Sequence, residues 1–129
     1  MLNIRIKSIP HKSHRYATCG DYYDVGNRHE VRVSNMSDWR YEFLVAIHEL
    51  IESHLCRHRG IVESAITDFD VWFEKARDMG LFDMDEEPGD DPRAPYMKEH
   101  RFATFVERLL AKELKVDWER YATEIERLP

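Results

Sequence analysis

The sequence contains only two cysteines, Cys19 and Cys56, and no apolar run of about 18 residues or more. The two thiols have neither the close spacing of a cysteine metal site nor the number needed for a disulfide framework, so we expect them to be reduced. The missing apolar run argues against a membrane-spanning helix. The first residues alternate apolar and polar side chains and lack the apolar core of a secretory signal. The sequence therefore predicts a soluble, cytoplasmic protein that does not associate with membranes.

An excess of basic residues is also missing. The chain has 19 Lys and Arg against 25 Asp and Glu, which gives a net charge of -6. General nucleic-acid binders and proteins that bind anionic membranes need a basic surface, so neither partner is expected. A local basic patch is still compatible with the segment that contains Lys7, His11, Lys12, His14 and Arg15. Of these, His11, His14 and Arg15 could reach a substrate anion, although exposed basic residues are common.

Several well-known binding motifs are absent. There is no Gly-rich phosphate loop, no dinucleotide fingerprint and no Gly-x-Ser-x-Gly, so the corresponding nucleotide and hydrolase families are not indicated. Hydrophobic residues nevertheless make up 43% of the chain, and the aromatic ones are spread along it. This composition predicts a single domain over residues 1–129 with one core. Sheet and loops are expected in 1–36, and helices in 37–129.

The first part of the chain carries strand patterns. Apolar and polar residues alternate over 2–7, which predicts a strand with one buried face. The segments 21–25 and 30–33 flank Gly26-Asn27 and resemble a hairpin with a short loop. We expect these three strands to form an antiparallel sheet.

The second part carries helical patterns. Apolar periodicity predicts long helices over 39–59, 62–78 and 95–114 and a short one over 117–128. An acidic, exposed loop is expected over 80–94. The predicted caps, starts and stops are Ser37 or Asp38, Gly60, Pro95 and Asp117. The fold class is therefore α+β, with a three-stranded antiparallel sheet packed on three long helices and a short C-terminal one.

Two of these helices have an apolar stripe that we expect to face the core. In the second helix the stripe is Val62, Ala65, Ile66, Phe69, Trp72, Phe73 and Ala76. In the third helix it is Phe102, Phe105, Val106, Leu109 and Leu110.

The first helix contains His48-Glu49-Leu50-Ile51-Glu52. Four residues apart, His48 and Glu52 lie one above the other on the helix, a spacing at which two side chains can bind one metal ion. Both flank apolar surface, where a carboxylate is costly unless it is paired, hydrogen-bonded or coordinating. Two interpretations follow: a metal site, or a pairing of Glu52 with an arginine and a buried hydrogen bond from His48.

A strand followed by a helix with this motif resembles the zincin metallopeptidases, whose motif is His-Glu-x-x-His. The resemblance covers residues 30–60. It implies that His48 and Glu52 are zinc ligands and that Glu49 is the catalytic base that activates a metal-bound water. The sequence departs from the family motif because Glu52 stands in place of the second histidine.

A third ligand is expected from the third long helix. With His100 the set would be two imidazoles and one carboxylate, which suits catalytic zinc with an open position, although iron or manganese would also fit. Glu107 could orient the His100 imidazole from outside the ligand set. Glu99 and Asp70 are further candidates, for which a surface position is the alternative.

Two other groups resemble metal sites more weakly. His54 and His58 are also four residues apart, but histidines near the end of a helix more often pack and hydrogen-bond. The acids of 83–87 slightly resemble a calcium loop, but the glycine is misplaced and Ala94 occupies the twelfth position. We therefore expect a solvated acidic loop.

The whole chain is also similar to small uncharacterised phage and prophage proteins. The segments that carry this resemblance are 9–11, 20–22, 48–52, 87–96 and 99–104. The resemblance implies location in the host cytoplasm if the protein is phage-encoded. It implies no established activity.

Three functions are compatible with these patterns. The first is a zincin-like metal-dependent hydrolase of a peptide, amide or ester bond, whose substrate the sequence does not identify. The second is a non-enzymatic, phage-type protein that binds a protein partner and contains a structural metal or a buried polar cluster. The third is a Mg-dependent nucleotide pyrophosphohydrolase, for which Glu49 and Glu52 would supply Glu-x-x-Glu. The second half of that motif is missing, because Glu74 is followed by Arg77 at the required spacing.

Overall fold

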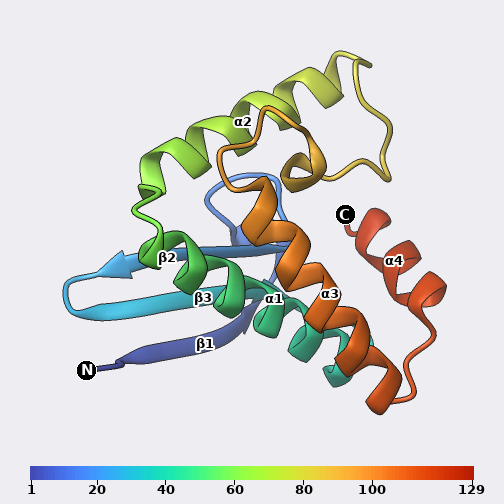
Figure 1. Ribbon diagram of the computed structural model, residues 1–129. Coiled ribbons are helices and arrows are strands. Elements are labelled where there is room, and N and C mark those ends of the chain that lie inside the picture. Colours follow the sequence, from blue (N-terminus) through green and yellow to red (C-terminus); the bar gives the residue numbers. More distant parts are fainter.

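The computed structural model describes residues 1–129 and contains three strands and four α-helices, an α+β arrangement as predicted (Figure 1). The elements in chain order are β1 (Ile4–Ile9), a 3-10 turn η1 (His11–Ser13), β2 (Gly20–Val25), β3 (Arg28–Ser34), α1 (Trp39–His58), α2 (Glu63–Asp78), a 3-10 turn η2 (Pro88–Asp90), α3 (Met97–Glu113) and α4 (Trp118–Glu126).

The sheet has the strand order β1-β3-β2 and is mixed. β2 and β3 form the predicted antiparallel hairpin, with Gly26 at a φ of 60° in its turn. β1 pairs with β3 in parallel, so the prediction of an all-antiparallel sheet is wrong. The reason is the connection over residues 10–19, which crosses the end of the sheet and leaves the central position free for β3. A strand reached by such a long connection does not have to pair with its neighbour in the sequence.

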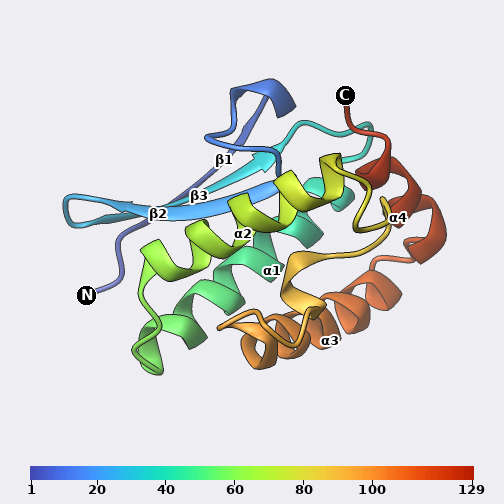
Figure 2. The ribbon, with the colours of Figure 1, turned by 90° about the horizontal axis from the view of Figure 1, so that it is seen from above.

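All four helices lie on one side of the sheet (Figure 2). Alternation along the strands directs Tyr22, Val31 and Val33 toward these helices, where they are buried in the core. α1 packs on this inner face of the sheet, and α3 runs antiparallel beside α1 (Figure 1). The site described below lies between these two helices.

Most helix ends follow the predicted local signals, but the start of α3 does not: the helix begins at Met97 after Tyr96, two residues beyond the predicted Pro95. The Asp38 side chain accepts a hydrogen bond from the backbone N–H of Arg40 and caps α1. Gly60 follows this helix with a φ of 72°, a left-handed conformation that glycine adopts without strain. Asp117 caps α4 in the same way, through the N–H of Arg120.

The buried face of α3 is not the one that its apolar stripe predicted. Phe102 is 52% exposed and Phe105 60% exposed, and Leu109 is exposed as well. The side of α3 that packs inward carries small and polar residues instead, namely Glu99, His100, Ala103, Glu107 and Ala111. Alanines allow the α1 and α3 backbones to approach closely, and the polar side chains of this face bond to one another across the interface.

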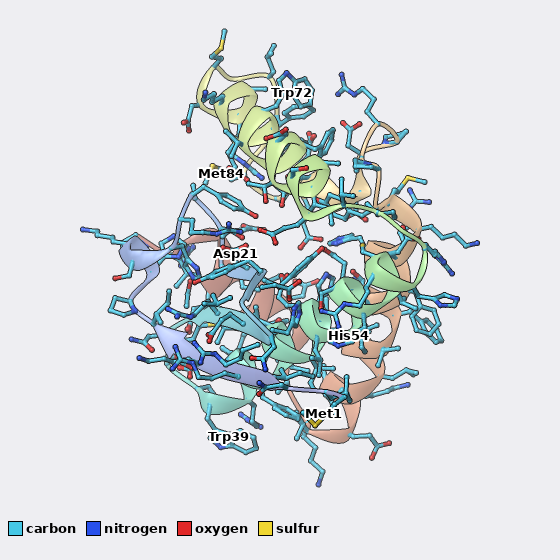
Figure 3. All side chains as sticks on the ribbon, turned by 90° about the vertical axis from the view of Figure 1, so that its left-hand side faces the viewer. Met1, Asp21, Trp39, His54, Trp72 and Met84 are labelled. Carbon is cyan, nitrogen blue, oxygen red and sulfur yellow. The ribbon has the colours of Figure 1, made fainter.

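The stripe of α2 is buried only in part. Ile66, Phe73 and Ala76 are buried, whereas Val62 is exposed and Trp72 is 43% exposed. Figure 3 shows Trp72 at the edge of the molecule, at the opposite end from Trp39. None of the four helices combines the length and the apolar character that crossing a membrane requires.

Candidate metal centre

Three side chains from α1 and α3 converge on one point. His48 Nε2 lies 3.1 Å from Glu52 Oε2 and 3.1 Å from His100 Nδ1. His100 Nδ1 lies 2.9 Å from the same Glu52 oxygen. All three residues are buried, and their three donor atoms form a nearly equilateral triangle. The structure thus brings together the three residues that the sequence suggested as ligands.

The outward-facing nitrogen of each imidazole is held by a second carboxylate. His48 Nδ1 donates to Glu107 Oε1 at 2.7 Å, and Tyr121 donates its hydroxyl proton to the other oxygen of Glu107 at 2.6 Å. His100 Nε2 donates to Glu87 Oε2 at 2.9 Å. Carboxylates in this position fix the tautomer and the ring orientation of metal-binding histidines.

The third side chain is fixed from the sheet. Tyr22 on β2 donates its hydroxyl proton to Glu52 Oε1 at 2.9 Å, so the other oxygen of Glu52 is free to face the two imidazoles. Tyr22 is itself buried in the core. The carboxylate of Glu52 is therefore oriented by the sheet rather than by its own helix.

This hydrogen-bond pattern determines which atoms face the centre. His48 Nδ1 and His100 Nε2 carry the N–H groups that donate to carboxylates. In neutral rings the other nitrogens, His48 Nε2 and His100 Nδ1, therefore present lone pairs. Together with Glu52 Oε2, three lone pairs point at one another across about 3 Å. A cation at the centre removes this repulsion. It is supplied either by two protons, one on each ring, or by one divalent metal ion.

The raised pKa values of the two histidines likewise show that this point of the structure favours positive charge. Burial opposes a charge on His48, but its hydrogen bonds to Glu107 and Glu52 raise its pKa well above the usual value. Burial also opposes a charge on His100, and the hydrogen bonds to Glu52 and Glu87 raise its pKa. Two protonated rings with nitrogens 3.1 Å apart would repel each other, a cost that a single ion between them avoids.

The donor set fits zinc. Ligand atoms bound tetrahedrally at 2.0–2.1 Å lie about 3.3 Å from one another, so distances of 2.9–3.1 Å need to expand by only a few tenths of an ångström. Three protein ligands leave a fourth position open. The same donors are compatible with iron or manganese.

Glu49 lies beside this triangle. It lines a cavity of about 110 Å³ together with His48, Glu52, Glu87 and His100. Burial and the neighbouring charge of Glu52 raise the pKa of Glu49 well above its usual value. No side chain in the structure donates a hydrogen bond to its carboxylate, which distinguishes it from the carboxylates that hold the two histidines.

Two glycines make room for the groups around the cavity. A side chain at Gly20, the first residue of β2, would collide with the Glu49 carboxylate, and one at Gly89 would collide with the His100 ring. Gly89 lies in η2, so the loop after α2 packs its backbone directly against the imidazole. The acidic loop therefore closes one side of the site.

The other candidate residues lie outside the triangle. Glu99 is buried in an ion pair with Arg59, and Asp70 accepts hydrogen bonds from the hydroxyls of Tyr16 and Tyr96. Glu107 was expected to orient His100, which is wrong: it holds His48, because antiparallel packing places residue 107 opposite residue 48.

The second histidine pair does not form a site. The His54 ring bonds to the carbonyl of Leu50, and His58 is exposed. The acids over 83–87 were expected to be solvated, and Glu87 departs from this because its carboxylate reaches His100.

A different histidine cluster lies between α1 and the sheet. His29 Nδ1 lies 2.8 Å from Asp24 Oδ1, and its Nε2 lies 2.9 Å from Ser53 Oγ. The order matches that of a Ser-His-Asp triad. However, Ser53 is only 5% exposed and lies 3.0 Å from the Leu50 carbonyl, so its hydroxyl is not accessible to a substrate. This cluster is a hydrogen-bonded link between β3 and α1.

Sequence reasoning missed three residues of the candidate metal centre: Tyr22, Glu87 and Tyr121. All three come from elements remote in sequence from His48, and no spacing rule connects them with it. The Pro88-Gly89 pair after Glu87 was the available signal, since a glycine in an acidic loop allows a close approach of the backbone.

Comparisons of the chain with protein-family models, with curated proteins and with solved structures found no match.

Proposed function

We propose that this protein is a zinc-dependent hydrolase that acts on a peptide, amide or ester bond, with His48, Glu52 and His100 as zinc ligands. The observation that carries the proposal is the convergence of three lone pairs whose outer atoms are held by Glu107, Glu87 and Tyr22. Zinc with three such ligands and an open position supplies Lewis-acid polarisation of a carbonyl and lowers the pKa of water.

The chain contributes a base and a fixed geometry. Glu49 faces the cavity without a hydrogen-bond donor of its own, and a cation bound at the triangle would favour its ionised form. Its carboxylate could then take a proton from water and pass it to the leaving group. Glu107 and Glu87 keep the two imidazoles in the tautomers that binding requires. Tyr22 keeps one oxygen of Glu52 directed at the centre.

A second candidate is a structural metal in a protein without catalytic activity. One observation favours it, since the cavity of about 110 Å³ is smaller than the roughly 300–1,000 Å³ of typical small-molecule sites. In this alternative the metal and its three ligands hold α1 against α3, and Glu49 has no catalytic role.

The test is elemental analysis of untagged protein by ICP-MS, combined with a screen of fluorogenic peptide, amide and ester substrates. Three proteins are compared: the wild type, His48→Ala/Glu52→Ala and Glu49→Gln. We expect nearly one zinc per chain in the wild type and in Glu49→Gln, and none in the double variant. Hydrolysis by Glu49→Gln should fall by about 100-fold or more.

The two candidates predict different results. Zinc in the wild type with no hydrolysis of any substrate class would support the structural metal and overturn the hydrolase. A wild type that binds no zinc, iron or manganese would overturn both.

A further inference from the structure

The charges of the chain are divided between its two parts. Residues 1–36 contain six Lys and Arg against three Asp and Glu, a net charge of +3. Residues 37–129 contain 13 against 22, a net charge of -9. The first 36 residues, which include the three strands, are therefore basic although the whole chain has a net charge of -6.

The outer face of the sheet carries this basic charge. Alternation directs Arg5, Arg32 and Tyr23 to the side opposite the helices, while Tyr22 and Val31 point inward. Figure 2 shows no α-helix on this outer side, although the connection over residues 10–19 with η1 lies there.

This connection covers one end of the face, where His11 and His14 bond to Ser34. The part of the face around Arg5, Arg28 and Arg32 remains open to a partner.

Its centre is a buried carboxylate under three arginines. Glu30 is 0% exposed although it lies on the uncovered face. Arg5, Arg28 and Arg32 each donate an Nε–H to its oxygens, at 3.1, 2.5 and 3.2 Å. One negative charge thus positions three positive ones.

The arginines use only part of their hydrogen-bonding capacity. Each is bound to Glu30 through Nε, and the terminal Nη1 and Nη2 groups donate to no other residue. The side chains of Arg5, Arg28 and Arg32 are 46%, 39% and 24% exposed. Pre-positioned guanidinium groups with free terminal N–H donors are suited to phosphate oxygens, which they can bind in a bidentate manner.

Residues around the three arginines extend the face. Lys7 pairs in register with Arg32 on the neighbouring strand and adds a further charge. The Tyr23 ring lies at the edge of the cluster, 4.2 Å from the Arg15 guanidinium and 6.0 Å from that of Arg32. Arg15 forms two hydrogen bonds with Asp21, so its charge is already compensated.

We propose that the outer face of the sheet binds single-stranded nucleic acid through its phosphate backbone, with Arg5, Arg28 and Arg32 as the main contacts. Charge complementarity identifies the partner as a polyanion. The face spans two strand spacings, about 10 Å, which suits one extended backbone better than a duplex whose major groove alone is about 12 Å wide. The Arg15 guanidinium already lies over the Tyr23 ring, so the contacts we propose are with phosphates rather than with bases.

This surface is independent of the metal centre. Tyr22 and Tyr23 are adjacent in β2 but point to opposite sides of the sheet, the first to Glu52 and the second to the arginines. The acidic helical part repels phosphate, so a bound strand would be confined to the sheet. Binding of nucleic acid and hydrolysis can therefore be tested separately.

The test is fluorescence anisotropy with a labelled oligonucleotide of about 20 thymidines and its uridine equivalent, between about 50 and 200 mM salt. We expect the logarithm of the binding constant to fall with the logarithm of the salt concentration with a slope of about -2 for three phosphate contacts. The test variant is Arg5→Gln/Arg28→Gln/Arg32→Gln with Glu30→Gln, which leaves no buried carboxylate unpaired. It should bind at least about tenfold more weakly.

The matched control is Lys98→Gln/Arg101→Gln on the exposed face of α3, which removes the same net charge of two. It should bind like the wild type, and circular dichroism should show that both variants are folded. If both variants bind the oligonucleotide equally more weakly than the wild type, net charge alone explains the effect, and the outer face of the sheet is not the binding site. Absence of binding by the wild type at low salt would overturn it as well. Preference for a duplex of the same length, or for vesicles of anionic lipid, would overturn the choice of partner.

Discussion

Helix α1 carries two polar clusters built from the same kinds of side chain, and they differ in where their protons are. In the first, His48 and Glu52 meet His100, and both rings give their outer N–H to carboxylates. In the second, His29 lies between Asp24 and Ser53. The single hydroxyl proton of Ser53 has two acceptors within reach, His29 Nε2 at 2.9 Å and the Leu50 carbonyl at 3.0 Å. When it is donated to a neutral His29 that in turn donates to Asp24, a proton lies between each pair of neighbours in the cluster.

The comparison shows why burial and a histidine are not enough to indicate a metal site. Asp24, His29 and Ser53 form a chain in which donors and acceptors alternate, and no further charge is needed. His48, Glu52 and His100 form a ring of acceptors, because each neutral imidazole already donates its one N–H to the carboxylate behind it. Only the ring of acceptors formed by His48, Glu52 and His100 requires a cation.

The largest expected effect separates the two clusters by their response to zinc. Saturating zinc, at about 1,000 times its dissociation constant, should stabilise the wild type by about 4 kcal/mol. Ser53→Ala, which loses about 1 kcal/mol in the absence of zinc, should gain the same stabilisation from it. Glu52→Ala should gain none. Urea denaturation with zinc and with a chelator measures all three, and an equal zinc response in Glu52→Ala would contradict the comparison.

The next effect concerns Asp70, a half-buried acid on α2 whose carboxylate is bound only by the hydroxyls of Tyr16 and Tyr96. Burial, opposed by these hydrogen bonds, raises the pKa of Asp70 from 3.8 to about 7. The folded protein therefore prefers protonated Asp70. This contribution to stability is complete below pH 3.8 and is lost as the pH rises through 7, at about 1.4 kcal/mol per pKa unit and a few kcal/mol in total.

Asp70→Asn mimics the protonated acid and should lose less stability than the wild type between pH 4 and 8, as measured by urea denaturation across that range. Asp68→Asn, an exposed acid on the same helix, is the control and should follow the wild type. Parallel pH profiles for wild type and Asp70→Asn would show that Asp70 is ionised throughout.

The smallest effect tests the carboxylates behind the rings. Glu107→Gln removes the charge that orients His48 but leaves the ligands in place, so zinc affinity should fall by about 10–100-fold, or roughly 1.4–2.7 kcal/mol. Competition with a fluorescent zinc chelator measures it. Glu113→Gln, with the same charge change on the exposed side of α3, should bind zinc like the wild type. If both variants bind equally well, the Glu107 contact has no role in metal binding.

The sequence by itself determined the local elements and one pair of candidate ligands. Short side chains and glycines at Asp38, Gly60 and Asp117 marked the helix ends, because caps depend on atoms within one helical turn. The spacing of His48 and Glu52 placed both on one side of α1 for the same reason. Gly26 marked the hairpin that joins β2 and β3.

Only the tertiary structure decided which surfaces meet. β1 pairs in parallel with β3 because a long connection left the centre of the sheet open, and no local pattern records that choice. α3 turns Ala103 and Glu107 toward α1 and leaves Phe102 and Phe105 exposed, since hydrogen bonds and close packing across the helix pair outweigh burial of the apolar stripe. The carboxylates that bond to His48 and His100 come from elements remote in the chain. Which nitrogen of each ring carries the proton is therefore determined only when those elements come together.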